Sequence, residues 1–191
     1  MKREYPKNPI IAVGVVVFSG DSILLIKRRK PPKLLEWSIP GGAQKLGEKL
    51  AETAVREVYE ETSILIKNIT LIDAVDLIEH NGNKVIEYHY SLVDYMAEYT
   101  RGKLKTGNDV IDAKWVSIND LKAYNLWIET TKVIKTAYKM RKKMYQIKES
   151  SIFERLIKSI GQHLKFLAIA LAFSTLVYGG IYLLLSFSGK I

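Results

Sequence analysis

The chain of 191 residues is long enough for one buried domain of about 130 to 150 residues and an additional segment. It contains no cysteine, which excludes disulfides, thiolate metal sites and a cysteine nucleophile. The net charge of +9 is uneven: residues 1–127 hold 18 Lys and Arg against 17 Asp and Glu, a net of +1, whereas residues 128–191 hold 11 against 3, a net of +8. The nearly neutral first part argues against a nucleic-acid partner.

The first third of the chain predicts three short strands and a helix. Residues 10–18 (IIAVGVVVF) and 23–27 (ILLIK) are rich in β-branched residues and are separated by the turn sequence SGDS, which is typical of a hairpin. Residues 37–42 (WSIPGG) predict a third strand that ends at its proline and glycine pair. The sequence after residue 47 predicts a helix that ends near residue 62.

Two longer strands follow the helix. Residues 64–79 and 85–98 are strand-like, and the Asn81-Gly82 pair between them is the strongest hairpin signal in the chain. A polar loop, a short strand, a helix start and a longer helix come next, and we place them at residues 102–112, 114–116, 117–120 and 129–145. The order β-β-β-α-β-β-β-α predicts an α/β fold in which helices pack on a mixed sheet.

The last part of the chain predicts a membrane span. Residues 166–187 (FLAIALAFSTLVYGGIYLLLSF) carry no charge over 22 residues, which as a helix is about 33 Å long and matches the hydrocarbon core of a bilayer, about 30 Å. The alternative is a buried core helix, but a soluble helix normally keeps a polar stripe. Because ten of the eleven Lys and Arg residues after residue 127 precede the span, we expect a single-pass C-terminal membrane anchor with the folded domain in the cytoplasm.

These boundaries divide the chain into four segments. We expect a folded domain over residues 1–146, a basic amphipathic linker helix over 147–165, the transmembrane helix over 166–187 and a short tail over 188–191. The linker either packs on the domain or lies on the membrane surface. The pair Gly179-Gly180 offers a close-packing surface within the span, so a homodimer is an additional expectation.

Three acids on the helix after residue 47 share one face. Glu57, Glu60 and Glu61 are spaced i, i+3 and i+4, so their side chains project together and repel each other. One interpretation is a solvated surface helix in which Arg56 forms weak pairs with acids four residues away. The other is a site for a hard divalent cation, since Mg²⁺ is bound by a few carboxylates together with substrate phosphates.

The pattern around these acids resembles a known signature. Residues 42–64 (GAQKLGEKLAETAVREVYEETSI) contain a glycine, a glutamate after five further residues, an Arg-Glu pair after seven more, an apolar residue and a Glu-Glu pair. This arrangement resembles the Nudix box of Nudix hydrolases, and the resemblance extends over about residues 10–145. It departs at Ser63, where the family usually has glycine. Because serine is strained in a left-handed helix end, we expect an altered helix exit with little effect on the metal site.

The resemblance implies a fold and an activity. The fold is a Nudix-type α/β/α sandwich around a mixed β-sheet, to which this chain adds the transmembrane helix. The activity is Mg²⁺- or Mn²⁺-dependent hydrolysis of a nucleoside diphosphate linked to another moiety. Because the segment after the box is similar in layout to that of ADP-ribose pyrophosphatase-like members, we expect ADP-ribose to be cleaved to AMP and ribose 5-phosphate. The alternatives are a pyrophosphohydrolase for oxidised nucleoside triphosphates and a non-catalytic, membrane-anchored nucleotide sensor.

The resemblance also assigns roles to residues of the box. Glu57, Glu60 and Glu61 match the positions that bind metal. Glu48 matches the glutamate that supports the metal shell at the start of the helix. Arg56 matches the arginine that orients the neighbouring carboxylates. All five residues are therefore expected to belong to the catalytic site.

Residues outside these five complete the expected site. The substrate-binding candidates are two basic residues at the end of the second strand and the glycine pair before the helix: Arg28, Arg29, Gly41 and Gly42. A surface role or contact with anionic lipid is the alternative for the two arginines. A further carboxylate often assists as ligand or base in this family, and Asp109 is the first candidate, with Asp112 and Glu79 behind it.

Overall fold

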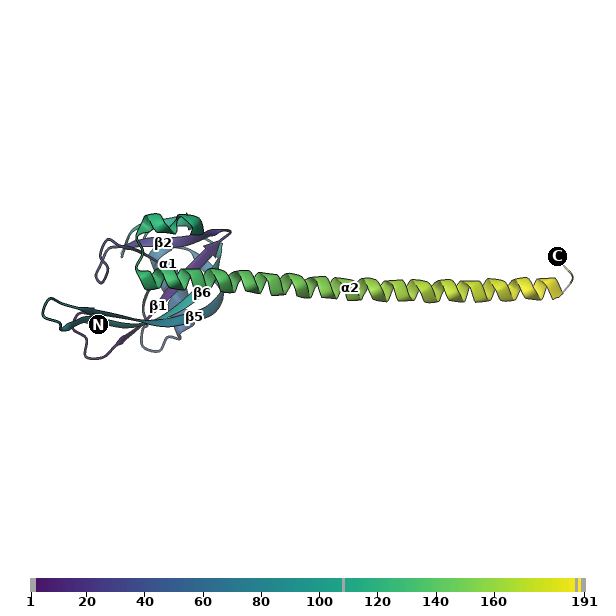
Figure 1. Cartoon of the computed structure of the whole chain (residues 1–191), viewed down its shortest axis with the longest axis horizontal. Helices are drawn as coiled ribbons and strands as arrows, with labels where there is room; N and C mark the ends of the chain where they lie inside the picture. The colour runs from purple at the N-terminus through teal and green to yellow at the C-terminus, as the bar shows by residue number, and fades with distance from the viewer. Residues whose placement is uncertain (1–2, 108, 188, 190–191) are drawn as a thin grey trace. The chain divides into compact units, whose positions relative to one another are not determined.

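The computed structural model describes residues 3–107, 109–187 and 189 (Figure 1). The chain divides into two compact units, residues 1–140 and 141–191. The first unit contains a seven-stranded mixed sheet with helices, as the sequence predicts. The expected tail of residues 188–191 lies outside the described residues except for Gly189.

Strands β1 (Ile10–Ser19) and β2 (Ser22–Arg28) form the predicted hairpin. Gly20 turns the chain with a φ of 57°, a left-handed conformation that glycine adopts without a steric penalty. The two strands pair next to this turn and then take other partners. β1 pairs in parallel with β6 (Ile86–Arg101), and β2 pairs antiparallel with β7 (Val110–Ser117).

The segment WSIPGG forms two strands, so the prediction of a single strand is wrong. β3 (Trp37–Ser38) pairs with β2, whereas β4 (Gly41–Ala43) pairs with β1. Pro40 lies between them and has no backbone N–H, so the ladder cannot continue through it. Its carbonyl accepts a hydrogen bond from Val15 N–H at 2.8 Å, which fixes the crossing from one partner strand to the other.

Strands β5 (Leu65–His80) and β6 form a long antiparallel ribbon (Figure 1). Their turn contains the predicted Asn81-Gly82 pair, and the Asn81 side-chain oxygen accepts hydrogen bonds from the N–H groups of Asn83 and Val85. β7 begins at Val110, four residues earlier than residue 114, because it pairs with β2 back to that point. The polar loop before β7 is correspondingly shorter than expected.

Helix α1 (Leu50–Thr62) begins with a cap in which the Glu52 carboxylate accepts a hydrogen bond from Lys49 N–H at 3.0 Å. It ends at Ser63, which adopts the left-handed conformation (φ 57°, ψ 24°) that glycine usually supplies. Ser63 N–H donates to the Tyr59 carbonyl at 2.8 Å. The expectation of an altered helix exit is therefore wrong: the serine tolerates a strain on the order of 1 kcal/mol, and the left-handed exit is kept.

Helix α2 (Ile128–Phe187) follows the 3-10 helix η1 (Ile118–Tyr124), whose cap is Ser117 as predicted. α2 joins in one helix three segments that the sequence analysis separates: the helix of residues 129–145, the linker and the span. By length and composition, it is the helix among the described residues that could cross a membrane. The boundaries at residues 146 and 165 stay predictions, and the pair Gly179-Gly180 lies outside the residues whose side chains are described.

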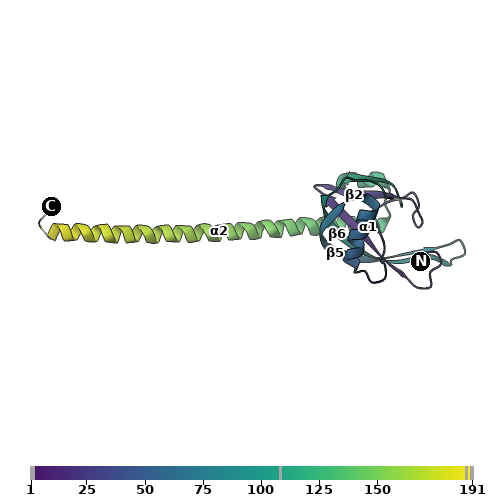
Figure 2. The same cartoon turned by 180° about the vertical axis from the view of Figure 1, so that it is seen from behind.

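The two faces of β1 pack on different helices, which produces the α/β/α layers. The odd-numbered valines of β1 pack with Ala54 and Val58 of α1. Val16 and Phe18 point to the opposite face and pack with Ile134 of α2. Figure 1 shows the first turns of α2 in front of the strands. Figure 2 shows the unit from the opposite side, with α1 in front.

Candidate active site

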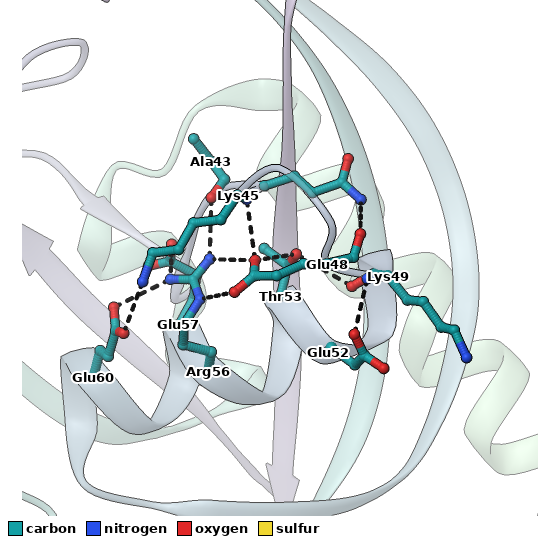
Figure 3. A network of polar contacts seen from close by, with 10 residues as sticks. Ala43, Lys45, Glu48, Lys49, Glu52, Thr53, Arg56, Glu57 and Glu60 are labelled. Carbon is teal, nitrogen blue, oxygen red and sulfur yellow. Dashed lines mark hydrogen bonds and ion pairs between the residues drawn. The ribbon is translucent and has the colours of Figure 1, made fainter. Parts of the chain in front are cut away.

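The residues of the box lie on α1 and on the loop that enters it (Figure 3). Arg56 is at the centre: its Nε donates to Glu48 Oε1 at 2.6 Å and its Nη2 to Glu48 Oε2 at 2.8 Å, a bidentate ion pair. Its Nη1 donates to Glu57 at 2.6 Å and to Glu60 at 3.1 Å. Nη2 also donates to the Ala43 carbonyl of β4 at 3.1 Å. One guanidinium thus ties three carboxylates to a strand end.

This network determines the charge state of Glu48. The pKa of Glu48 is lowered to about 2, first because Arg56 donates to its carboxylate, and further because Lys45 N–H and the Thr53 hydroxyl donate to it. The same ion pair raises the pKa of Arg56. Both groups are therefore charged at neutral pH. Both carboxylate oxygens of Glu48 accept hydrogen bonds from Arg56, so Glu48 holds the arginine in place.

Glu61 lies in a different environment from Glu48. The residue is 8 % exposed, and Gly41 N–H donates to its Oε2 at 2.9 Å. The pKa of Glu61 is raised to about 8, first by burial and then by the negative charges of Glu57 and Asp109, while the Gly41 hydrogen bond and the charge of Arg28 oppose the rise. A buried carboxylate beside other acids is a group whose ionised form a bound cation would stabilise.

The glycine pair before α1 has two separate structural roles. A Cβ at Gly42 would lie 2.5 Å from the carboxyl carbon of Glu57, so glycine leaves that carboxylate its place. A Cβ at Gly41 would lie 2.1 Å from the carbonyl oxygen of Val13 on β1. Gly42 therefore makes room for a residue of the site, whereas Gly41 makes room for the neighbouring strand.

The loop before β7 is held against the end of α1. Gly107 N–H donates to the Glu61 carbonyl at 2.8 Å. A Cβ at Gly107 would lie 2.0 Å from the Glu60 carbonyl oxygen, so this close approach requires glycine. Because Asp109 follows two residues later, the anchored loop brings its carboxylate to the same cavity as Glu61.

A cavity collects most of the residues assigned from the sequence. Its lining includes the following residues: Arg28, Gly41, Gly42, Glu57, Glu61 and Asp109. Within the described chain, the remaining assigned residues lie outside that lining. The Glu60 side chain is 51 % exposed and pairs with Lys45 at 3.3 Å. Arg29 donates to the Val110 carbonyl at 3.1 Å. Position in the cavity thus favours Glu57 and Glu61 over Glu60 as metal ligands. It favours Arg28 over Arg29 as a substrate-binding residue.

The same criterion separates the three acids considered outside the box. Asp109 lines the cavity and pairs with Lys30 at 2.5 Å, and Lys30 lines the cavity as well. Asp112 and Glu79 form ion pairs with other lysines. Neither belongs to the lining of the cavity in the described part of the chain. Asp109 is therefore the assisting carboxylate that the geometry favours.

The sequence analysis missed part of the cavity. Asp94 of β6 lines it and is 3 % exposed, and burial raises the pKa of this carboxyl to about 7. Trp127 and Thr130, at the start of α2, line the same cavity. Asp94 is the charged residue of the otherwise uncharged strand segment 92–97 (LVDYMA), and a lone acid there was a usable signal. The local sequence around Trp127 and Thr130 carries no such signal.

A divalent metal fits the carboxylates of the cavity. Among the described residues, no three Asp, Glu, His or Cys side chains are already grouped as metal ligands. Mg²⁺ does not require such a group, because it is usually bound by one or two carboxylates with waters and substrate phosphates. Glu57 and Glu61 share the cavity, and their oxygens are the donors that this ion prefers. These two residues would hold it, and Glu60 is the outermost of the three expected ligands.

Comparison with known families agrees with the pattern of the box. Residues 8–137 match the NUDIX domain. This match covers more than half of the chain, and the chain therefore belongs to the NUDIX family. The Nudix hydrolase resemblance drawn from residues 42–64 is confirmed.

Curated relatives match the same part of the chain. An ADP-ribose pyrophosphatase of Methanocaldococcus jannaschii is 29 % identical over 114 residues, which is 60 % of this chain and 65 % of the relative. The NAD-capped RNA hydrolase NudC of Pseudomonas putida is 32 % identical over 124 residues, which is 62 % of this chain and 40 % of the relative. This chain thus spans less than two thirds of the length of either relative.

Solved structures share the fold. The NUDIX domain of Shewanella oneidensis NrtR, crystallised with ADP ribose, has a TM-score of 0.60 at 22 % identity, over 71 % of this chain and 90 % of that one. The MutT NUDIX hydrolase of Burkholderia pseudomallei has a TM-score of 0.60 at 26 % identity, over 68 % of this chain and 98 % of that one. The predicted α/β/α fold around a mixed sheet is confirmed.

Proposed function

We propose that this chain hydrolyses a nucleoside diphosphate linked to a second moiety, with ADP-ribose as the substrate and AMP and ribose 5-phosphate as the products. The observation that carries the proposal is the cavity lined by Glu57, Glu61 and Asp109 together with Arg28. Acids alone repel a diphosphate and become useful only when a cation stands between them and the phosphates. An acidic cavity of this kind therefore supports metal-assisted chemistry on a phosphate anhydride.

Positioning is the main contribution of the box residues. Glu57 and Glu61 would hold Mg²⁺ or Mn²⁺. When bound, the metal neutralises diphosphate oxygens and lowers the pKa of an attacking water. Arg56 fixes the Glu57 carboxylate through its 2.6 Å hydrogen bond, and Glu48 holds Arg56 through two further bonds. The ligand geometry is thus set before substrate arrives.

Asp109 and Arg28 would act on the water and the phosphates. The water oxygen forms a bond to one phosphorus, and the bridging P–O bond on that phosphorus breaks. Asp109 would accept the proton that the water loses, because its carboxylate lines the same cavity as Glu61. Arg28 and Lys30 line the same cavity, and their positive charges would stabilise the negative charge that the leaving phosphate gains.

The choice of ADP-ribose is supported by the two curated relatives. Their names refer to ADP-ribose and to NAD, and both molecules contain ADP joined through its diphosphate to a second ribose. The cavity acids serve this anhydride and that of a nucleoside triphosphate equally well. Hydrolysis of oxidised nucleoside triphosphates is therefore retained as an alternative that only product analysis separates.

Product analysis of the full chain in detergent micelles with Mg²⁺ tests the proposed function. The expected products from ADP-ribose are AMP and ribose 5-phosphate, and the reaction is expected to stop when the metal is chelated. Pyrophosphate released from an oxidised or normal nucleoside triphosphate, with ADP-ribose left intact, would instead identify the alternative enzyme. Binding of ADP-ribose without turnover would identify a sensor and contradict the proposed hydrolysis.

We also propose that the apolar end of α2 anchors the chain in a membrane, with the NUDIX domain in the cytoplasm. The support is the uncharged stretch of residues 166–187 and the excess of basic residues before it. Extraction of cell membranes with alkaline carbonate is expected to leave the full chain in the pellet. A chain that ends at Gln146 is the matched control and is expected in the supernatant. Release of the full chain by carbonate would contradict the anchor.

A further inference from the structure

Asp94 is a buried acid that the proposed chemistry does not use. It lies in β6 on the face that also carries Tyr90 and Leu92, and all three residues line the cavity. Only 3 % of Asp94 is exposed. Within the described residues, its carboxyl makes neither a hydrogen bond nor an ion pair with another residue. Among the described residues, no fully buried side-chain oxygen lacks a hydrogen-bond partner, so the unpaired oxygens of Asp94 keep some access to the cavity. A largely buried carboxyl that is open only to a cavity can bond to a ligand held there.

The strand beside Asp94 is shaped to leave room for this carboxyl. β1 and β6 are parallel neighbours, and Gly14 of β1 is in register with Asp94. A Cβ at position 14 would lie 2.2 Å from Asp94 Oδ1 and 2.9 Å from Ile39 Cδ1. The carboxyl therefore leans over the backbone of β1, into the space that the missing side chain leaves open. Gly14 lines the cavity as well, so this space belongs to it.

Asp94 lies at a distance from the metal-binding end that suits a nucleoside. Gly14 pairs with Gly41 on one side and with Asp94 on the other, so Gly41 and Asp94 lie on strands two positions apart. Two strand spacings are about 10 Å. Because Gly41 N–H donates to Glu61, the metal-binding end of the cavity lies at the Gly41 strand. A nucleoside joined to a diphosphate at that end can reach the Asp94 strand across this distance.

The surroundings of Asp94 suit the apolar surface of a nucleoside. Tyr90, Leu92 and Trp127 line the cavity, and they also belong to one hydrophobic cluster. Aromatic and aliphatic side chains provide a surface for the flat face of a base. A single carboxyl within such a surface pairs with a polar group of the ligand. Binding pockets commonly gain specificity from one polar group among apolar residues in this way.

We propose that Asp94 is a specificity-determining residue that accepts a hydrogen bond from a donor on the nucleoside part of the substrate. The substrate class rests on the proposed function above. The donor is an amino group of the base or a hydroxyl group of the ribose, which present the same chemistry to a carboxyl. A substrate analogue that lacks this donor leaves the Asp94 carboxyl unpaired in the complex. Binding sites reject such analogues most strongly.

The role of Asp94 is tested by a thermodynamic cycle, in which the Asp94 carboxyl and single groups of the ligand are removed separately and together. Binding of AMP, of purine riboside 5′-monophosphate, which lacks the amino group, and of 2′-deoxy-AMP and 3′-deoxy-AMP is measured by calorimetry with Mg²⁺. The protein is the full chain in detergent micelles, as wild type and as Asp94→Val. Valine suits a strand and removes a carboxyl that is unfavourable when buried, so this variant is expected to fold with an undiminished melting temperature.

The control is Asp73→Val on β5. Asp73 is in register with Asp94 on the neighbouring strand, but it is exposed and does not line the cavity, within the part of the chain that the structure describes. This variant removes the same chemical group from outside the cavity, together with a negative charge that raises the pKa of Asp94, and it leaves the Asp94 carboxyl in place. It is expected to bind all four nucleotides as the wild type does.

The wild type is expected to bind one analogue roughly 10- to 100-fold more weakly than AMP, the loss typical of a hydrogen bond to a charged or buried group. The analogue that loses affinity identifies the base or the ribose as the donor. Asp94→Val is expected to bind AMP as weakly as that analogue and to show no further loss. Equal losses in both proteins, unchanged AMP affinity in Asp94→Val, or no AMP binding by the wild type would overturn the proposal.

Hydrolysis of ADP-ribose is measured on the same proteins, so the two proposals fail separately. If ADP-ribose is hydrolysed but every analogue loses the same affinity in the wild type and in Asp94→Val, the proposed function is kept and the role of Asp94 is rejected. Coupling without turnover supports the role of Asp94 and rejects the proposed hydrolysis.

Discussion

The Glu61→Gln variant is expected to lose roughly 10²- to 10³-fold in kcat for ADP-ribose, the loss typical when one preorganised charge-stabilising group is removed. Glu61 is buried in the cavity, and its carboxylate would be one of the two metal ligands there. Glutamine has the same shape and keeps an oxygen for the hydrogen bond from Gly41 N–H, which the wild type makes at 2.9 Å. The loss therefore reports the missing charge and not a disturbed fold. Steady-state kinetics at saturating Mg²⁺ measure it.

The stability of this variant is expected to change in the opposite direction. Folding raises the pKa of Glu61 from its ordinary value of 4.5 to about 8. The penalty for folding with this group ionised is absent below pH 4.5 and grows as the pH rises toward 8. Glutamine removes the penalty, so the melting temperature of Glu61→Gln relative to wild type, without added metal, is expected to be higher at pH 8 than at pH 5. A lower melting temperature at both values would mean that the kinetic loss is structural.

Three further variants are compared with Glu61→Gln by their loss of kcat. Asp109→Asn is expected to lower kcat by about 10- to 100-fold, because its carboxyl lines the cavity. Glu60→Gln is expected to lower kcat less than about tenfold, because exposed ion pairs such as those of Glu60 contribute little. Asp112→Asn is the control outside the cavity and is expected to retain full activity. A loss in Glu60→Gln as large as in Glu61→Gln would show that Glu60 turns into the site.

Local patterns predicted the elements of the fold better than their pairing. The β-branched runs, the Asn81-Gly82 turn and the helix of the box each depend on residues close in sequence, and the structure confirms them. The split of WSIPGG into β3 and β4 depends on Pro40 and on which strands lie on either side. The parallel pairing of Gly14 with Asp94 joins residues far apart in the chain. No local pattern encodes such a contact.

The same distinction holds for the site. Arg56, Glu57 and Glu61 follow from helical spacing because one helix carries all three. Asp109 reaches the cavity because the loop hydrogen bonds from Gly107 to the end of α1, a tertiary contact that the sequence alone does not display. Asp94 enters through strand pairing. The sequence therefore predicted the acids that are proposed to hold the metal, whereas it did not predict that Asp94 lines the same cavity.

Metal binding is the property on which the remaining chemistry depends. Arg56 fixes Glu57 by a hydrogen bond, and glycine at position 42 leaves room for the Glu57 carboxylate. Glu61 lines the same cavity. If these two carboxylates hold the ion, loss of either removes a charged ligand, and the affinity is expected to fall by roughly tenfold or more, since even residues that only support metal ligands contribute 10- to 100-fold. The Asp112→Asn variant changes a carboxylate outside the cavity and is expected to bind metal as the wild type does.

The most direct measurement is therefore the binding of Mn²⁺ to the full chain in detergent micelles, followed by the electron paramagnetic resonance signal of the free ion, with and without AMP. The wild type and Asp112→Asn are expected to bind Mn²⁺ with the same affinity, and Glu57→Gln and Glu61→Gln at least about tenfold more weakly. Equal Mn²⁺ affinity in all four proteins, or no binding by the wild type even with AMP present, would contradict the assignment of the acidic cavity as a metal site.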